Sequence, residues 1–230
     1  MSVLSTFVQS ENIAKTNPLV TEFNEAGLAA MASIRRIKAG ETLYLEGDAA
    51  PFCYQVVSGV VKEYNTLEDG RRQVADFYGV GELFGISELD EQLHTAEAIT
   101  DCAVRCYPRE TFIQAIASSP ALSHHFLDTL MTRLHRARER MVMLGRMSAV
   151  QRVTAFLLRL SEEQETIDDI HLQMSRQDIA DHLGLTIETV CRALTELKKR
   201  GLIVMPSARL YSIPDEDGLG DVAHGHGAIH

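Results

Sequence analysis

The sequence predicts an α+β protein: an N-terminal roll of short β-strands, a long helix suited to dimerisation, and a C-terminal winged helix-turn-helix. Seven glycines divide residues 30–107 into short, often alternating runs, a pattern typical of a small β-barrel or roll. Apolar residues recur at heptad spacing from Leu127 to Leu144. Nearer the C-terminus, two helices that each start at a capping residue are separated by Gly184.

The composition is that of a globular chain. Of its 230 residues, 45% are hydrophobic and 23% are charged, which provides enough apolar side chains for a sizeable core. The chain has no apolar stretch of membrane-spanning length, and its first residues lack the basic and apolar regions of a secretory signal. Its four cysteines are too few and too irregularly spaced for a disulfide framework. We therefore expect a cytoplasmic protein without a membrane partner.

The net charge of −10 does not exclude nucleic acid as a partner, because the charge is unevenly distributed. Residues 171–214 hold six basic and four acidic side chains, and Lys198, Lys199 and Arg200 are contiguous. A local basic surface can bind phosphate whatever charge the rest of the chain carries.

Four segments are predicted along the chain. They are a roll over residues 20–107, connecting and dimerisation helices over 108–146, a winged helix over 147–214, and a disordered tail over 215–230. The Gly-rich, acidic composition after Pro214 is the basis for expecting disorder there.

Three tight turns are predicted between strands. The first joins Tyr54–Val57 to Val60–Tyr64 as a hairpin about Ser58-Gly59, and the second lies at Asp69-Gly70. The third, at Pro206-Ser207, joins Leu202–Met205 to Leu210–Ile213 as the wing.

The long helix, which starts near Ser119-Pro120, carries an apolar seam. Its positions alternate by three and four residues: Leu127, Leu130, Leu134, Ala137, Met141 and Leu144. An amphipathic helix that packs on its own domain is the commoner explanation of such a stripe. The strict alternation inside an arginine-rich segment favours a seam between the two helices of a homodimer.

The C-terminal segment has the helix boundaries of a helix-turn-helix. Ser175 and Asp178 form a capping box for one helix, Gly184 supplies a turn, and Thr186 can cap the next helix. In this motif the second helix enters the major groove of double-stranded DNA.

One face of that second helix is suited to base recognition. At about 100° per residue, Val190, Leu194 and Leu197 fall on the packed side, opposite Glu188, Cys191, Arg192 and Thr195. Arg192 can bond a guanine through two hydrogen bonds, and Glu188 can accept one from a cytosine amino group. The predicted base contacts are therefore Glu188, Cys191 and Arg192. The predicted DNA-backbone contacts are Ser175, Thr186, Thr195, Lys198 and Lys199.

The alternative for this face is a surface helix in which Glu188 and Arg192 form an ordinary i,i+4 salt bridge. The caps, the glycine turn and the wing that follows favour DNA binding.

Two segments resemble the CRP/FNR superfamily of bacterial transcription regulators. One is Ser175–Ile203, SRQDIADHLGLTIETVCRALTELKKRGLI, which is similar to the DNA-recognition region of that superfamily. The other is Gly81–Ala98, GELFGISELDEQLHTAEA, which resembles the cyclic-nucleotide-binding, double-stranded β-roll of the same superfamily. The resemblance covers about residues 20–214 in the order roll, long helix, winged helix. It implies a sequence-specific DNA-binding regulator and not an enzyme.

Within the superfamily the resemblance is to the FixK type. The cAMP-binding members grip the phosphate with an arginine and a small hydroxyl residue, and His94 and Thr95 stand at those positions here. A neutral imidazole lacks the permanently charged fork of arginine. The cluster-bearing FNR branch carries cysteines near its N-terminus, whereas no cysteine here precedes Cys53. We therefore expect no cofactor. The motif E-x-x-C-R, from Glu188 to Arg192, stands where FNR has E-x-x-S-R, and FixK proteins often have cysteine at that position.

By this resemblance the chain is a homodimeric activator that binds a TTGAT-like palindrome and recruits RNA polymerase. Its targets would lie in microaerobic or anaerobic respiration or in nitrogen fixation. Glu68 and Asp69 occupy the loop that corresponds to a polymerase-contacting hairpin in FNR-type activators, and they are candidates for that contact.

Cys191 is a candidate redox switch. It is expected to face solvent beside Arg192 and near the Lys198–Arg200 run, which favours the thiolate. Oxidation to sulfinic or sulfonic acid would place a negative charge against the DNA backbone. The alternative is that its sulfur only packs against a thymine methyl group.

Two other functions are kept as alternatives. An effector-gated regulator of the CRP type would need a small ligand in the roll. A cupin enzyme would need clustered histidines with a carboxylate, and His94 is the only histidine before residue 124. No metal site is expected, since adjacent His124 and His125 diverge on a helix.

Overall fold

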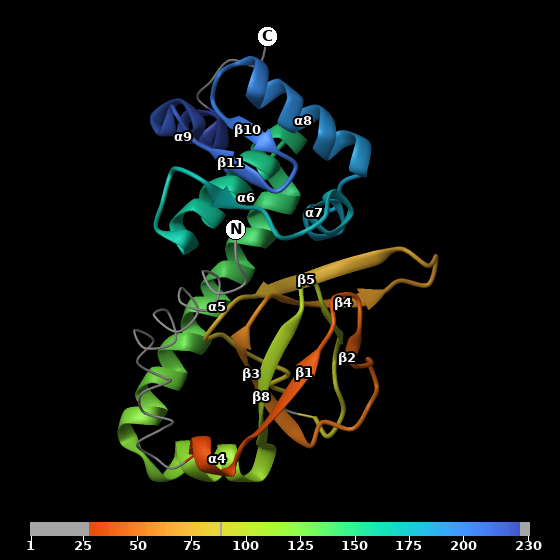
Figure 1. The fold of residues 1–230 in the computed structure, drawn as a ribbon, viewed down its shortest axis with the longest axis vertical. Coiled ribbons are helices and arrows are strands. Elements are labelled where there is room, and N and C mark those ends of the chain that lie inside the picture. The colour runs from red at the N-terminus through yellow and green to blue at the C-terminus, as the bar shows by residue number, and fades with distance from the viewer. Residues whose placement is uncertain (1–27, 88, 226–230) are drawn as a thin grey trace. The chain divides into compact units, whose positions relative to one another are not determined.

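The computed structural model describes residues 28–225 except residue 88, so the predicted start of the roll at residue 20 lies outside the described residues. The chain divides into two compact units, residues 1–135 and residues 136–230. Helix α5 (Pro120–Arg146) contributes to both units (Figure 1).

The N-terminal unit is built around a roll of two four-stranded antiparallel sheets, with strand orders β1-β8-β3-β6 and β2-β7-β4-β5. Alternating side chains of both sheets point inward and form a core that includes Val56, Val61 and Val104. The predicted roll and the α+β class are therefore confirmed. Its elements are α3 (Leu28–Met31), β1 (Ser33–Ile37), β2 (Thr42–Tyr44), β3 (Phe52–Ser58), β4 (Val61–Thr66), β5 (Arg72–Tyr78), β6 (Leu83–Phe84), β7 (Thr95–Ala98), β8 (Cys102–Pro108) and α4 (Arg109–Ser118).

The hairpin predicted about Ser58-Gly59 is wrong. β3 pairs with β8 and β6, whereas β4 pairs with β7 and β5, so the chain passes from one sheet to the other at this turn. Gly59 has φ +86°, and a Cβ there would lie 2.6 Å from the Asp101 carbonyl oxygen, which is why glycine is required at the crossing. The turn predicted at Asp69-Gly70 is confirmed, since β4 and β5 pair antiparallel on either side of it.

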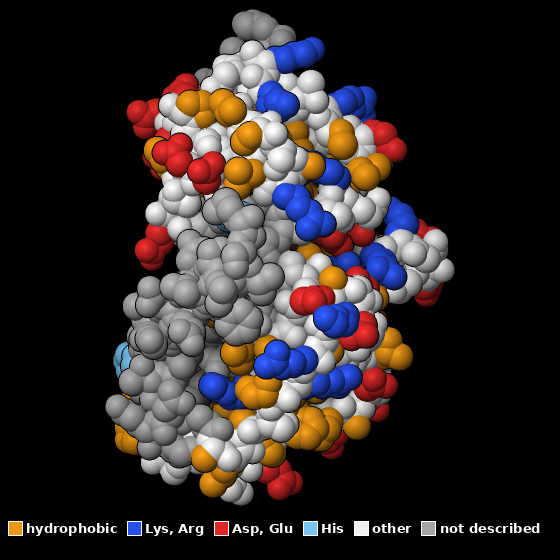
Figure 2. Space-filling view, in the orientation of Figure 1, with side chains coloured by type: hydrophobic (Ala, Val, Ile, Leu, Met, Phe, Trp, Pro, Cys, Tyr) orange, Lys and Arg blue, Asp and Glu red, His pale blue; other side chains and the backbone are white. Residues whose placement is uncertain are grey.

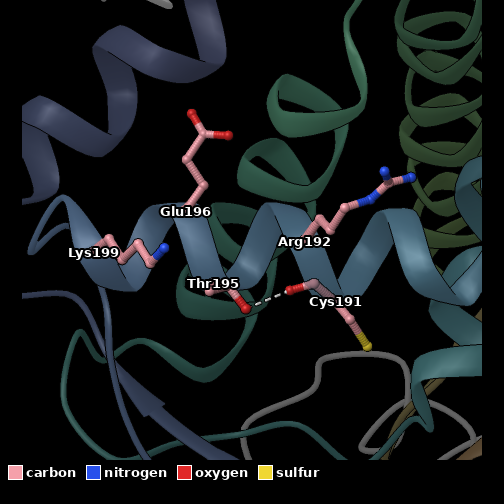
Figure 3. A pocket seen from close by; sticks show the side chains of 5 residues that line it. All are labelled: Cys191, Arg192, Thr195, Glu196 and Lys199. Carbon is pink, nitrogen blue, oxygen red and sulfur yellow. Dashed lines mark hydrogen bonds between the residues drawn. The ribbon is translucent and has the colours of Figure 1, made fainter.

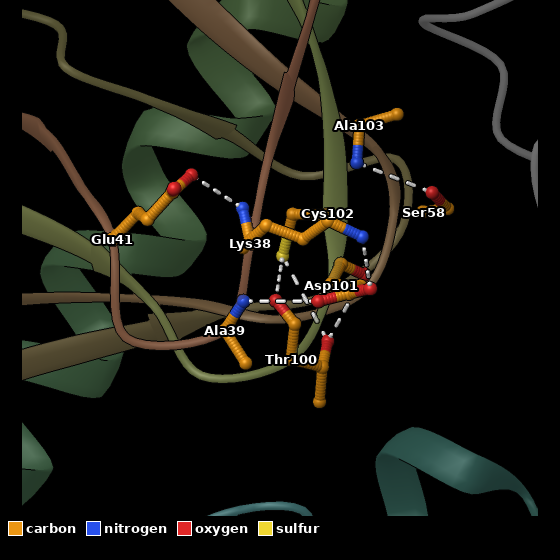
Figure 4. Close-up of polar contacts among 8 residues, drawn as sticks. All are labelled: Lys38, Ala39, Glu41, Ser58, Thr100, Asp101, Cys102 and Ala103. Atoms are coloured by element: carbon orange, nitrogen blue, oxygen red, sulfur yellow. Dashed lines mark hydrogen bonds and ion pairs between the residues drawn. The ribbon is translucent and has the colours of Figure 1, made fainter.

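Polar contacts fasten this end of the roll (Figure 4). The Asp101 carboxylate accepts hydrogen bonds from the Lys38 Nζ and the Ala39 N–H, each at 3.0 Å. These bonds hold the pKa of Asp101 below its usual value, the Ala39 N–H having the largest effect. They tie the β1–β2 turn to the β7–β8 turn.

The C-terminal unit is a winged helix-turn-helix. Ser148 and Gln151 form a capping box at the start of α6 (Ala149–Gln164), and α5 ends at Arg146, two residues before Ser148. The three-stranded sheet has the order β10-β11-β9. The elements are α6 (Ala149–Gln164), β9 (Ile170–His171), α7 (Arg176–Leu183), α8 (Ile187–Lys199), β10 (Val204–Ser207), β11 (Leu210–Ser212) and α9 (Glu216–His224). The wing turns at Ala208-Arg209, two residues later than predicted, because Pro206 and Ser207 still belong to β10.

The expectation of a disordered tail over residues 215–230 is wrong for residues 215–225. The Asp215 carboxylate accepts from the Gly218 N–H at 2.9 Å and caps α9. Leu219, Val222 and Ala223 are buried, and α9 contacts α6. Their i, i+3, i+4 spacing forms one apolar helical face, which the acidic, Gly-rich composition conceals.

Candidate nucleic-acid interface

Helix α8 presents one polar face because its other face is buried in the winged helix. The Thr186 hydroxyl accepts from the Thr189 N–H at 3.3 Å and caps the helix. The residues that pack inward are Val190, Ala193, Leu194 and Leu197. Glu188, Cys191, Arg192, Thr195, Lys198 and Lys199 are all exposed.

A shallow hollow lies on the exposed face of α8. It is lined by Cys191, Arg192, Thr195, Glu196 and Lys199 (Figure 3). Four of these residues are predicted DNA contacts, whereas the predicted contacts Glu188 and Lys198 do not line it. Figure 3 shows Arg192 and Glu196 projecting to one side of the helix and Cys191 and Thr195 to the other.

Glu196 is absent from the predicted set. Its carboxylate lies 3.8 Å from the guanidinium of Arg200, one turn further along. The helical period places it about 80° from Glu188, at the edge of the polar face, so periodicity alone is enough to find it.

The salt bridge weighed as an alternative for Glu188 and Arg192 is not among the contacts of the described residues. Arg192 donates instead to the Thr189 hydroxyl at 3.3 Å. A hydrogen bond from its own backbone N–H lowers the pKa of Glu188, and the Thr186 hydroxyl and the charge of Arg192 act in the same direction. Glu188 is therefore an ionised acceptor at neutral pH, and the Arg192 guanidinium keeps donors available for a base edge.

The predicted phosphate contacts differ in whether their hydrogen-bond donors are already used within the protein. The hydroxyl of Ser175 donates to the Asp178 carboxylate at 2.6 Å, and that of Thr195 donates to the Cys191 carbonyl at 2.8 Å. A hydroxyl has a single proton to donate, and in both residues that proton is already donated to an acceptor within the protein. Lys198 and Lys199 form no ion pair with any described residue. Within the C-terminal unit, Figure 2 shows basic side chains toward α8 and acidic ones toward α9.

The wing brings a further basic residue that the sequence analysis did not single out. Arg209 is exposed at the turn between β10 and β11. Arg176, at the start of α7, donates to the Ala208 carbonyl at 3.1 Å and so fastens this turn to the helix-turn-helix. A basic side chain in a predicted wing turn is a signal that sequence reasoning can use.

All four cysteines lie in the described part of the chain, and Cys191 is the exposed one. Cys53, Cys102 and Cys106 are buried in the roll. Burial raises the pKa of the Cys53 thiol to about 11 and also raises the pKa values of Cys102 and Cys106. These three thiols are therefore protonated and shielded at neutral pH.

The predicted seam residues form an exposed apolar stripe along α5. The members Leu127, Leu130, Leu134, Ala137, Met141 and Leu144 are all exposed. Met131 and Val142, which strict heptad spacing omits, are also exposed, at 56% and 60%, and widen the stripe. A stripe of this size is typical of a surface that packs against another surface, since soluble proteins seldom leave large apolar patches in water.

A buried carboxylate, Glu63, lies among tyrosines inside the roll. The Glu63 carboxylate accepts from the hydroxyls of Tyr44 (2.5 Å) and Tyr78 (2.6 Å), and from the Gly85 N–H (3.2 Å). Burial, reinforced by the charge of Glu63, raises the pKa values of both tyrosines, so they stay protonated donors. A Cβ on Gly85, the last glycine of the GELFG loop, would lie 2.7 Å from the Tyr54 ring.

The two positions after that loop do not supply an anion-binding pair. The Thr95 hydroxyl accepts from the Glu46 N–H at 3.0 Å and keeps its own proton, so the pair lacks its cation and not its hydroxyl. His94 carries a buried Nδ1 that has no hydrogen-bond partner among the described residues, and it lacks the bidentate fork of arginine. The residues present therefore do not fit a cyclic nucleotide.

The predicted polymerase contact lies at the tip of the β4–β5 hairpin, which projects from the roll (Figure 1). Glu68 and Asp69 are both exposed. Asp69 accepts from the Arg71 N–H at 3.0 Å and from its Nε at 2.7 Å, and these bonds lower the pKa of its carboxyl group. Glu68 is the carboxylate that stays available to a partner.

No helix in the described ranges is long and apolar enough to cross a membrane. The same residues contain no group of three or more His, Cys, Asp or Glu side chains placed to hold a metal ion.

Comparison with known proteins gives consistent matches. The chain matches the family model of the Crp-like helix-turn-helix domain over residues 151–222 and that of the cyclic nucleotide-binding domain over residues 34–119. It is 39% identical over 209 residues to the nitrogen fixation regulation protein FixK of Rhizobium meliloti, covering 90% of this chain and 96% of that protein. FixK of Bradyrhizobium diazoefficiens is 36% identical over 203 residues, covering 85% and 86% of the two chains.

A solved structure of a FixK protein has a fold similar to that of this chain. FixK2 from Bradyrhizobium japonicum superposes with a TM-score of 0.78 at 34% identity, covering 86% of this chain and 98% of that one. The relatives are transcription regulators and not enzymes.

Proposed function

Because the chain belongs to the CRP/FNR family of transcription regulators, we propose that it is a homodimeric activator that binds a TTGAT-like palindromic operator. Its helix-turn-helix is a DNA-binding domain of the Crp-like type. Its proposed target genes lie in nitrogen fixation or in microaerobic and anaerobic respiration, and relatives named for the regulation of nitrogen fixation support the first of these.

The observation that carries the proposal is the exposed face of α8. Glu188 and Arg192 project from it as an acceptor and a donor without bonding each other, among the residues that the structure describes. In the proposed complex Arg192 bonds a guanine and Glu188 accepts from a cytosine amino group. Cys191 lies against the base edges on the other side of Glu188 from Arg192, and Lys198 and Lys199 contact phosphates.

The test is a pair of substitutions on this face. Arg192→Ala should lower the affinity for the palindrome by about 1–3 kcal/mol and relax discrimination at one base pair, because it removes a base contact. Lys199→Ala is the matched control, since loss of a phosphate contact weakens binding to all sequences alike. Fluorescence anisotropy on operators substituted at each position measures both effects. An Arg192→Ala protein that loses affinity equally for every sequence contradicts direct base recognition.

Contact with RNA polymerase is proposed at the hairpin tip, where Glu68 is the available carboxylate. Glu68→Ala should leave operator affinity unchanged and reduce transcription from the operator in a purified system. Unreduced transcription would remove this surface from the proposal.

Peroxide control through Cys191 is proposed on the same helix, because Cys191 is exposed and the other three thiols are buried. Each hydrogen peroxide transfers one oxygen atom to sulfur and leaves as water, so two equivalents convert the thiol to sulfinic acid. The resulting negative charge would repel DNA. Cys191→Ser should bind the operator with the same affinity before and after peroxide treatment, whereas the unmodified protein loses affinity. A serine variant that stays peroxide-sensitive places the oxidation elsewhere.

A further inference from the structure

Arg152 lies where the end of the long helix, the start of α6 and the end of α7 meet. Its Nη2 donates to the Leu144 carbonyl at 2.8 Å, and its Nε donates to the Met147 carbonyl at 3.1 Å. Its Nη1 donates to the Leu183 carbonyl at 3.0 Å. One guanidinium therefore binds the last turn of α5, the link to α6, and the final residue of α7.

The chemistry of helix ends explains this arrangement. The last carbonyls of a helix have no partner within it and carry partial negative charge. Arginine offers five donors on three nitrogens of a rigid planar fork, so it can bond carbonyls that lie apart, whereas the three donors of lysine share one nitrogen.

The turn of the helix-turn-helix lies beside Arg152 and the end of α5. Gly184 has φ +63°, and a Cβ there would lie 3.5 Å from Leu144 Cδ2 and 3.7 Å from Arg152 Nη1. Two residues, Leu185 and Thr186, separate Gly184 from the first residue of α8. The end of α5 is thus fastened to the turn from which the recognition helix begins.

We propose that Arg152 is a positioning residue that fixes α8 against the end of α5, and thereby sets the half-site spacing that the dimer accepts. This inference rests on the proposed function, because it takes α5 as the dimer helix and α8 as the recognition helix. In a two-fold dimer the recognition helices enter successive major grooves about one DNA turn apart. One added or removed base pair rotates a half-site by about 35°, so spacing selectivity requires a rigid link between the seam and each α8.

The experiment compares Arg152→Met with Arg146→Met, measured by anisotropy on palindromes at the spacing the unmodified protein prefers and with one base pair added or removed. Arg146→Met is the matched control, because it removes an exposed positive charge at the end of α5 whose side chain forms no hydrogen bond or ion pair with a described residue. We expect Arg152→Met to lose about tenfold in affinity at the preferred spacing, the equivalent of one lost base contact. Its affinities for the three spacings should converge, while binding to unrelated DNA and the dimer mass from light scattering stay unchanged. Arg146→Met should keep the full spacing preference.

The outcomes separate the inference from the proposed function. An Arg152→Met dimer that keeps the spacing preference of the unmodified protein overturns the inference alone, and so does a uniform loss of affinity at all spacings, which a purely structural role produces. If the unmodified protein shows no preference for the palindrome over scrambled DNA, the proposed function fails and the inference fails with it. Should Arg152→Met not fold, the same comparison is made with Arg152→Lys, which keeps the charge but not the fork.

Discussion

Thr154 illustrates how a single side chain limits the stability of the winged helix. It is fully buried on α6, and its hydroxyl has no hydrogen-bond partner among the described residues. A buried polar group without a partner loses its bonds to water and gains none in return.

Replacing Thr154 with valine keeps the shape and removes the unpaired hydroxyl. We expect Thr154→Val to raise the free energy of unfolding by about 1 kcal/mol, measured by urea denaturation. The matched control is Thr132→Val on the exposed surface of α5, which should change that free energy by less than about 0.5 kcal/mol. A destabilised Thr154→Val protein would show that the hydroxyl is bonded in solution.

At this scale, sequence reasoning finds side chains whose position follows from helical period. Cys191, Arg192 and Thr195 share the exposed face of α8 because the apolar residues on its other side are buried. The bonds those groups make are not visible in the sequence. Arg192 donates to the Thr189 hydroxyl, and the Thr195 hydroxyl donates to the Cys191 carbonyl. Both bonds depend on rotamers that neighbouring side chains determine.

Among the elements, α5 carries the apolar stripe on which the proposed dimer depends. Leu134 is 44% exposed in the protomer although it lies in the middle of the apolar stripe. Burial of this stripe against a second copy is the interaction that the proposed dimer requires.

A charge in the stripe should separate the protomers. Leu134→Glu is expected to yield monomers by light scattering and to lose palindrome binding, because the carboxylate would be desolvated at the interface. Thr132→Glu adds the same charge about 160° away on α5 and should remain dimeric. A Leu134→Glu protein that is still dimeric would place the interface on another surface.

The elements also show which contacts local pattern misses. The turn at Gly59 is visible in the sequence, but the partners of β3 and β4 are strands tens of residues away, and only those long-range pairings reveal that the two belong to different sheets. Helix α9 is missed for the opposite reason. Its acidic, Gly-rich composition outweighs the three apolar residues whose spacing defines its buried face.

For the whole molecule, the order of roll, long helix and winged helix follows from the sequence, since each part has its own periodicity and its own turn residues. The division into compact units falls inside α5, between residues 135 and 136, which no change in local pattern marks. The net charge of −10, summed over the whole chain, does not indicate where the basic and acidic surfaces lie. Basic side chains on α8 and acidic ones on α9 give one small domain two differently charged surfaces.

The stripe on α5 has a thermodynamic consequence for the complete assembly. Association of two copies stabilises the native state by mass action, so the melting temperature should rise with total protein concentration. Differential scanning calorimetry over a hundredfold dilution series measures this shift, and a melting temperature independent of concentration would contradict it. The amount of protein in the sample thus becomes a determinant of its heat resistance, and strong dilution weakens the native state without any change of sequence.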